Sequence, residues 1–116
     1  MVNIRRGEIY LAKFDPALSS EMSKTRPCLV IQNDVGNTYS PNTIVLAITS
    51  KITKDLPTCV FIPKNISGLE KDSSILCSHI YTFSINNRLI KKIGEITEEQ
   101  TISKVEDALK MSLNLK

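Results

Sequence analysis

The sequence predicts a small, mainly β protein: a strongly curved antiparallel barrel with one C-terminal α-helix, forming a single domain over residues 1–116. Three observations support this fold class. The length of 116 residues suits one domain with its own core. Short segments rich in aliphatic and aromatic residues follow one another at close spacing, separated by turn residues, which is typical of small antiparallel barrels. Only the C-terminal segment has a helical period.

Six strands are expected along the chain. The second strand opens at Arg26-Pro27, because a proline at a strand entrance costs no ladder hydrogen bond. The third is apolar on both faces and therefore belongs in the middle of the sheet. Turn chemistry is expected at residues 33–37 and 40–42, an exposed loop at 17–25 and a solvated turn at 70–72. The strands themselves are residues 7–14, 28–32, 43–49, 58–62 and 74–83, with a short sixth at 93–96.

The C-terminal helix is predicted from a stripe of apolar residues three or four positions apart, with Ala108 beside it. The stripe consists of Ile102, Val105, Leu109 and Leu113. Thr97 and Gln100 have the spacing of a capping box, which places the N-cap at Thr97.

The cysteines and the hydropathy indicate a cytoplasmic protein. Cys28, Cys59 and Cys77 are odd in number, lie in apolar stretches and form no C-x-x-C motif, so they are expected to be buried thiols in a reducing compartment. The longest aliphatic run, residues 44–48, is far shorter than the roughly 20 residues of a membrane span. The N-terminus lacks the apolar region of a signal peptide.

Charge is uneven along the chain. Residues 1–94 carry 12 basic and 7 acidic side chains, whereas residues 95–116 carry 3 basic and 5 acidic ones. A basic body attracts polyanions, although an ordinary solvated surface accounts equally well for a formal net charge of +3.

Sequence motifs exclude several kinds of chemistry. The chain has no glycine-rich phosphate loop, no G-x-S-x-G and no paired metal-binding histidines or aspartates, and His79 is its single histidine. We therefore expect no metal and no cofactor. One short segment combines Glu21, Lys24 and Arg26 just before a strand; it is either an exposed loop with ordinary charges or an anion site. In the second case Arg26, held by the proline that follows it, would offer its guanidinium to a phosphate.

Several motifs resemble the MazF/PemK family of toxins, and most closely its Gram-positive branch. They are R-G-E-I-Y at residues 6–10, R-P-C-L-V-I-Q-N-D at 26–34, the strand at 42–49 and D-S-S-I-L at 72–76. Their order and spacing match from about residue 5 to residue 113. The resemblance implies a small SH3-like, plasmid-maintenance-toxin barrel and a cytosolic endoribonuclease of a type II toxin–antitoxin pair. It also implies a homodimer, an acidic MazE-like antitoxin as partner, and single-stranded RNA as substrate.

The resemblance also implies which residues act. Arg26 and Thr49 match the family's catalytic arginine and threonine, and Glu21 matches the loop that borders the active site and holds RNA. Ser19, Ser20 and Lys24 belong to the same RNA-binding loop, and Ser19 stands where relatives carry glycine. His79 falls where relatives carry glutamine, at a base-reading position, and Tyr81 also departs from the family pattern.

The implied reaction is attack of a ribose 2′-OH on its own 3′-phosphate, giving a 2′,3′-cyclic phosphate and a 5′-OH. Arg26 suits charge stabilisation, because a guanidinium stays protonated at any working pH. Thr49 would donate a hydrogen bond to a phosphate oxygen, and Glu21 would act as base or only organise the loop. Two alternatives stay open on the sequence: a toxin of the same fold that poisons DNA gyrase, and a barrel that only binds protein or RNA.

Overall fold

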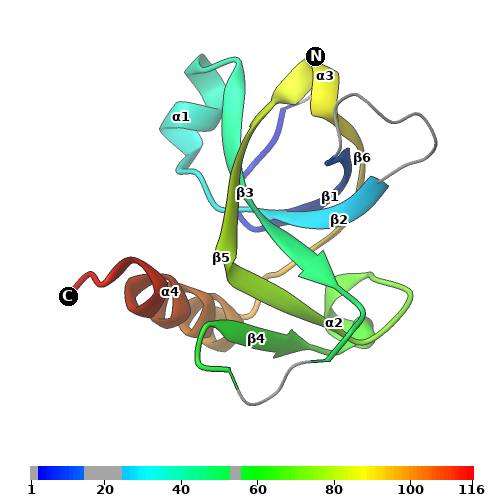
Figure 1. Ribbon diagram of the computed structural model, residues 1–116. Helices are drawn as coiled ribbons and strands as arrows, with labels where there is room; N and C mark the ends of the chain where they lie inside the picture. The colour runs from blue at the N-terminus through cyan, green and yellow to red at the C-terminus, as the bar shows by residue number, and fades with distance from the viewer. Residues whose placement is uncertain (1–2, 15–24, 53–55) are drawn as a thin grey trace.

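A computed structural model describes residues 3–14, 25–52 and 56–116 and confirms the predicted mainly β architecture (Figure 1). Within these residues, six strands form one sheet in the order β4-β5-β3-β2-β1-β6, and every neighbouring pair is antiparallel. The strands are β1 Glu8–Lys13, β2 Thr25–Val30, β3 Asn42–Thr49, β4 Cys59–Ile62, β5 Ser73–Ser84 and β6 Leu89–Glu95. β3 lies in the interior of the sheet, as its apolar sequence predicts.

A bulge in β5 bends the sheet. Leu46 of β3 lies opposite Ile80, but the next residue, Ala47, lies opposite Leu76, so residues 77–79 of β5 have no partner on β3. Bulges bend the strand that carries them and increase its twist. Two smaller register shifts between β1 and β6 act in the same way. The sheet therefore curls, and Figure 1 shows β5 changing direction between its two halves.

The two faces of the sheet carry two apolar cores. Alternation along β2 illustrates the division, since Leu29 belongs to one core whereas Cys28 and Val30 belong to the other. The first core lies under the C-terminal helix, and its largest members are Ile9, Leu46, Ile48, Ile62 and Ile75. The second fills the opposite side of the curled sheet and includes Tyr10, Ala12, Val45 and Phe83.

The C-terminal helix, α4 Glu99–Leu113, packs against β4 and β5 through Val105 and Ala108. The predicted apolar stripe is right for Ile102 and Leu109, which contact the first core, but wrong for Leu113, which is 51% exposed. The predicted capping box is also wrong. The N-cap is Glu98, whose carboxylate accepts a hydrogen bond from the Thr101 hydroxyl at 3.1 Å, so the helix begins one residue later than expected.

Three short helices were not predicted. Residues 33–37, expected as a turn, instead enter α1 Asp34–Tyr39, because the Asn33 side chain accepts a hydrogen bond from the Gly36 amide at 2.8 Å and caps the helix. α2 Lys64–Ser67 and α3 Ile85–Arg88 span four residues each. Helices this short carry too few residues to show a 3.6-residue period.

All three cysteines are free thiols, and Cys28 and Cys77 are buried as predicted. Burial raises the pKa of each of these two thiols to about 12, so they are not nucleophiles at neutral pH. Cys59 is only half-buried, because β4 lies at the edge of the sheet. No helix in the described part of the chain is long and apolar enough to cross a membrane.

Candidate active site

The ends of two adjacent strands bring Arg26 and Thr49 together. β2 and β3 pair from Cys28 opposite Ala47 to Val30 opposite Val45, and extending this register by two residues beyond the ladder would place Arg26 opposite Thr49. Residues directly opposite each other on antiparallel strands have Cβ atoms about 5 Å apart on the same face. The Arg26 side chain is exposed and that of Thr49 half-buried. Both residues line one groove of about 730 Å³.

This groove runs beside the sheet between β6 and the segment that joins α2 to β5. Its apolar floor includes Leu11, Pro27 and Ile48. Arg26 and Thr49 alternate with Pro27 and Ile48 along their strands, so their side chains leave the strands on the opposite side from those two residues. We call the edge of the groove that Arg26 and Thr49 line its rim. A reactive phosphate at this rim would have the groove directly beside it.

Two glycines hold the walls of the groove together. Gly68 adopts φ +84°, which a side chain would strain, and a Cβ there would come within 2.8 Å of the Ile93 carbonyl oxygen of β6. A Cβ at Gly94 would collide with the carbonyl oxygen of Ser67. The end of α2 and the strand β6 therefore touch backbone to backbone, and this contact fixes the width of the groove.

The groove is strongly basic. Four cations line it, Arg26, Lys71, Lys91 and Lys92, against the single carboxylate of Glu70. Lys92 forms ion pairs with Glu8 at 3.1 Å and Glu95 at 2.7 Å. Its hydrogen bonds to Glu95 and Glu8 raise the pKa of Lys92. The other three cations form no ion pair with any residue that the structure describes, so the positive charge of the groove is largely uncompensated there.

The Thr49 hydroxyl is positioned at the end of β3, where it can donate a hydrogen bond. Its oxygen accepts a hydrogen bond from the Lys51 amide at 3.1 Å, which fixes its position at the end of β3. The hydroxyl donates no hydrogen bond to another group among residues 3–14, 25–52 and 56–116. An anion at the rim would therefore meet a guanidinium from β2 and a hydroxyl from β3.

Four other predicted site residues belong to one segment of the chain. Ser19, Ser20, Glu21 and Lys24 lie outside the described residues. The strand that leads into their segment is anchored, since the Arg88 guanidinium donates a hydrogen bond of 2.9 Å to the Lys13 carbonyl.

His79 is exposed and lies in the bulge of β5, between Leu76 and Ile80, and it is not among the residues that line the groove. The position expected to read a base therefore lies on a different part of the surface from Lys71 and Lys91.

Sequence reasoning missed the lysines of the groove. Lys71 stands in the predicted solvated turn, whose Asp72 in fact accepts a hydrogen bond from the Lys64 amide at 3.0 Å. Lys91 and Lys92 precede the short strand predicted at 93–96 and belong to the longer β6. The only signal available was the basic excess of residues 1–94, which gives no position.

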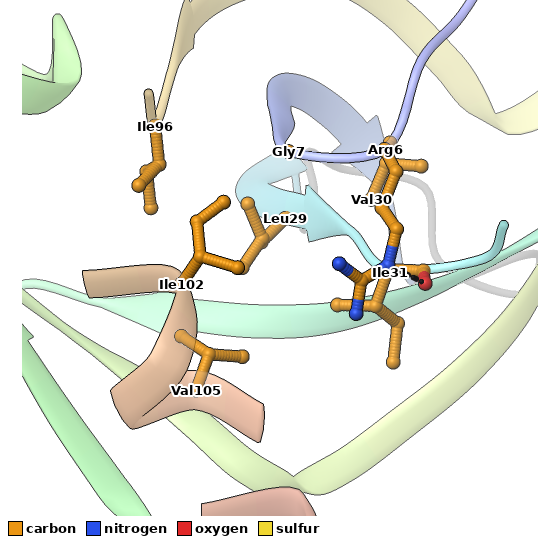
Figure 2. A pocket seen from close by; sticks show the side chains of 8 residues that line it. All are labelled: Arg6, Gly7, Leu29, Val30, Ile31, Ile96, Ile102 and Val105. Atoms are coloured by element: carbon orange, nitrogen blue, oxygen red, sulfur yellow. Dashed lines mark hydrogen bonds between the residues drawn. The ribbon is translucent and has the colours of Figure 1, made fainter. Parts of the chain in front are cut away.

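Figure 2 shows a second, smaller hollow, where α4 meets the start of the chain. Gly7, Leu29, Ile96, Ile102 and Val105 line it, and its volume is about 20 Å³. This is room for about one water molecule. Arg6, drawn at its edge, donates to the Ile31 carbonyl at 2.8 Å and pairs with Glu106 of α4. The hollow is a packing feature and not a substrate site.

Fold and site together define a class: a small curled antiparallel sheet that presents an arginine and a threonine at the rim of a cationic groove, suited to a polyanion. Within the described segments, no group of three His, Cys, Asp or Glu side chains is placed to hold a metal ion.

Comparison with known proteins then identifies the family. Residues 5–113 match the model of the PemK-like, MazF-like toxins of type II toxin–antitoxin systems, and the chain belongs to this family. It is 45% identical over 113 residues to endoribonuclease EndoA of Bacillus subtilis strain 168, covering 97% of this chain and 96% of that protein. The chain is therefore a homologue of an endoribonuclease over nearly its full length.

Solved structures agree on the fold. A mycobacterial endoribonuclease in complex with its cognate antitoxin matches with a TM-score of 0.80 at 21% identity, over 97% of both chains. MazF from Deinococcus radiodurans also matches with a TM-score of 0.80, at 19% identity, over 99% of this chain and 100% of that one. The resemblance of fold and family drawn from the sequence motifs is confirmed.

Proposed function

We propose that this toxin is an endoribonuclease that cuts single-stranded messenger RNA at a short sequence and thereby stops translation and growth. The observation that carries the proposal is that Arg26 of β2 and Thr49 of the adjacent strand β3 line the same cationic groove. The similarity to EndoA over nearly the whole chain favours a nuclease over the gyrase-poisoning and binding-only alternatives.

The proposed reaction needs no group other than the chain and the RNA. The 2′-oxygen attacks the adjacent phosphorus, the P–O5′ bond breaks, and the products are a 2′,3′-cyclic phosphate and a 5′-OH. Arg26 stabilises the charge that develops on the phosphoryl oxygens, and the Thr49 hydroxyl donates a hydrogen bond to one of them. The 2′ proton goes to a base, for which Glu21 is the candidate, and the O5′ leaving group takes up a proton from solvent water.

A single 2′-deoxy substitution at the cut site is expected to abolish cleavage of an otherwise unchanged RNA, because it removes the nucleophile. The all-ribose RNA should be cut in EDTA at an unchanged rate and yield 5′-OH ends. Electrophoresis with sequencing of the new 5′ ends measures both effects. Cleavage of the deoxy-substituted strand at the same bond would contradict the mechanism.

His79→Gln is expected to change the recognised sequence without lowering the maximal rate. The residue is exposed on the β5 bulge and lies apart from the residues that line the groove, so it is suited to contact a base rather than the reacting phosphate. Sequencing the cut sites of both proteins on one long RNA gives the measurement. The same motif and frequencies for both would remove His79 from recognition.

We further propose that the protein is a cytoplasmic homodimer held inactive by an acidic MazE-like antitoxin. The solved mycobacterial relative carries its cognate antitoxin. A cationic groove fits an acidic segment that folds on binding and covers Arg26. Sedimentation of the toxin alone and with the acidic product of the neighbouring gene tests the homodimer and the antitoxin complex. A monomer that does not bind this product would refute both.

A further inference from the structure

We propose that Lys71 and Lys91 bind the backbone phosphates that follow the reacting one, so that the RNA strand continues from Arg26 and Thr49 into the groove. This inference rests on the proposed function and extends it to the path of the substrate. The two lysines come from opposite walls, one from the segment between α2 and β5 and the other from β6.

Lys91 and Lys92 are neighbours in β6 but differ in electrostatic role. Lys91 lies opposite Leu11 of β1 and Lys92 opposite Tyr10, so their side chains leave opposite faces of the strand. Lys92 is occupied by Glu8 and Glu95, and Glu8 also accepts a hydrogen bond from the Tyr10 hydroxyl at 3.1 Å. Lys91 has no acidic partner among the described residues, so its ammonium is available to an external anion.

Lys71 occupies a fixed place on the opposite wall. Its carbonyl accepts a hydrogen bond of 2.9 Å from the buried Ser73 hydroxyl, and the next residue, Asp72, is tied to the first amide of α2. The backbone contact between Gly68 and β6 holds the whole segment against the wall that carries Lys91. The two ammonium groups are therefore presented by rigid backbone rather than by a free loop.

The apolar floor of the groove suits a nucleic acid strand in addition to the acidic segment of the antitoxin. Leu11, Pro27, Leu69 and Ile93 give apolar contact area between the cationic walls. Single-stranded RNA presents anionic phosphates at its edge and apolar base faces beside them, which matches this arrangement. The RNA strand extends beyond the phosphate that reacts at the rim. The groove adjoins that rim and can take up the adjoining nucleotides.

The test is the salt dependence of RNA binding, measured by fluorescence anisotropy with a labelled RNA that carries one 2′-deoxy nucleotide at the cut site. Each phosphate contact on a single strand contributes about −0.7 to the slope of log K against log salt. Lys71→Ala and Lys91→Ala are each expected to weaken binding and to make the slope shallower by about 0.7. Lys91→Arg should restore it.

Lys64→Ala is the matched control, because this exposed lysine of α2 lies outside the groove and its loss lowers the net charge equally. A slope that changes as much in Lys64→Ala as in Lys91→Ala would overturn the proposal in favour of a general charge effect. Unchanged RNA slopes with lost binding of an Asp/Glu-rich peptide would overturn it in favour of a protein partner. Failure of the wild type to cut all-ribose RNA would instead refute the proposed function, since binding is measured separately.

Discussion

Arg26→Ala is expected to lower the rate of RNA cleavage by at least 10²–10³-fold. Removing one preorganised donor to a developing oxyanion typically costs about 3–4 kcal/mol of transition-state stabilisation. Arg26 lies at the end of β2, next to β3, and it lines the groove together with Thr49, whereas the other lining cations, Lys71, Lys91 and Lys92, come from other segments. Single-turnover cleavage of a short RNA containing the recognised sequence measures the loss.

The fold should survive this substitution. Arg26 is exposed and forms no ion pair with any residue in the described part of the chain. We expect the melting temperature of Arg26→Ala to equal that of the wild type, and Arg26→Lys to recover only part of the rate because an ammonium cannot form the two-pronged hydrogen bond. Cleavage by Arg26→Ala at the wild-type rate would remove the residue from the chemistry.

Local patterns were enough to predict most of the fold. The strands around Tyr10, Leu29 and Leu46 are rich in apolar residues, and all three occur. The second strand begins at Thr25 and ends at Val30, whereas it was predicted to run to Gln32. The secondary-structure predictions were wrong where a tertiary contact determines the local conformation. Asn33 caps a helix in place of a turn, and β6 begins at Leu89 because pairing with β1 supports charged residues that have no strand pattern of their own. The three-residue bulge of β5 likewise leaves no mark on the sequence.

The candidate site was predictable in part. Arg26 and Thr49 were named from motifs that resemble the toxin family, and in the structure both residues line one groove at the ends of the adjacent strands β2 and β3. Lys71 and Lys91 could not be predicted from the sequence, because they come from separate segments that meet only when α2 packs against β6. Residues in contact across such a closure share no spacing that a sequence pattern can reveal.

Gly94→Ala is expected to destabilise the protein by about 2–3 kcal/mol, because overpacked sites typically cost about 1–3 kcal/mol and here the added methyl meets backbone rather than a flexible side chain. Gly94 does not have positive φ, so steric collision with Ser67 and not backbone strain is the cause. At roughly 4 °C per kcal/mol, the melting temperature should fall by about 10 °C. Calorimetry of the purified variant gives the value.

Gly94→Ala should also weaken RNA binding in the groove. The Ser67–Gly94 contact sets the distance between the wall that carries Lys71 and the wall that carries Lys91. Lys91→Ala, an exposed change on the same strand, is the matched control for stability and should leave the melting temperature within about 1 °C. Well below its own melting temperature, Gly94→Ala should bind RNA more weakly with Arg26 and Thr49 intact. A variant as stable as the wild type would mean that α2 and β6 separate without cost, and the rigid groove on which the RNA path depends would then be wrong.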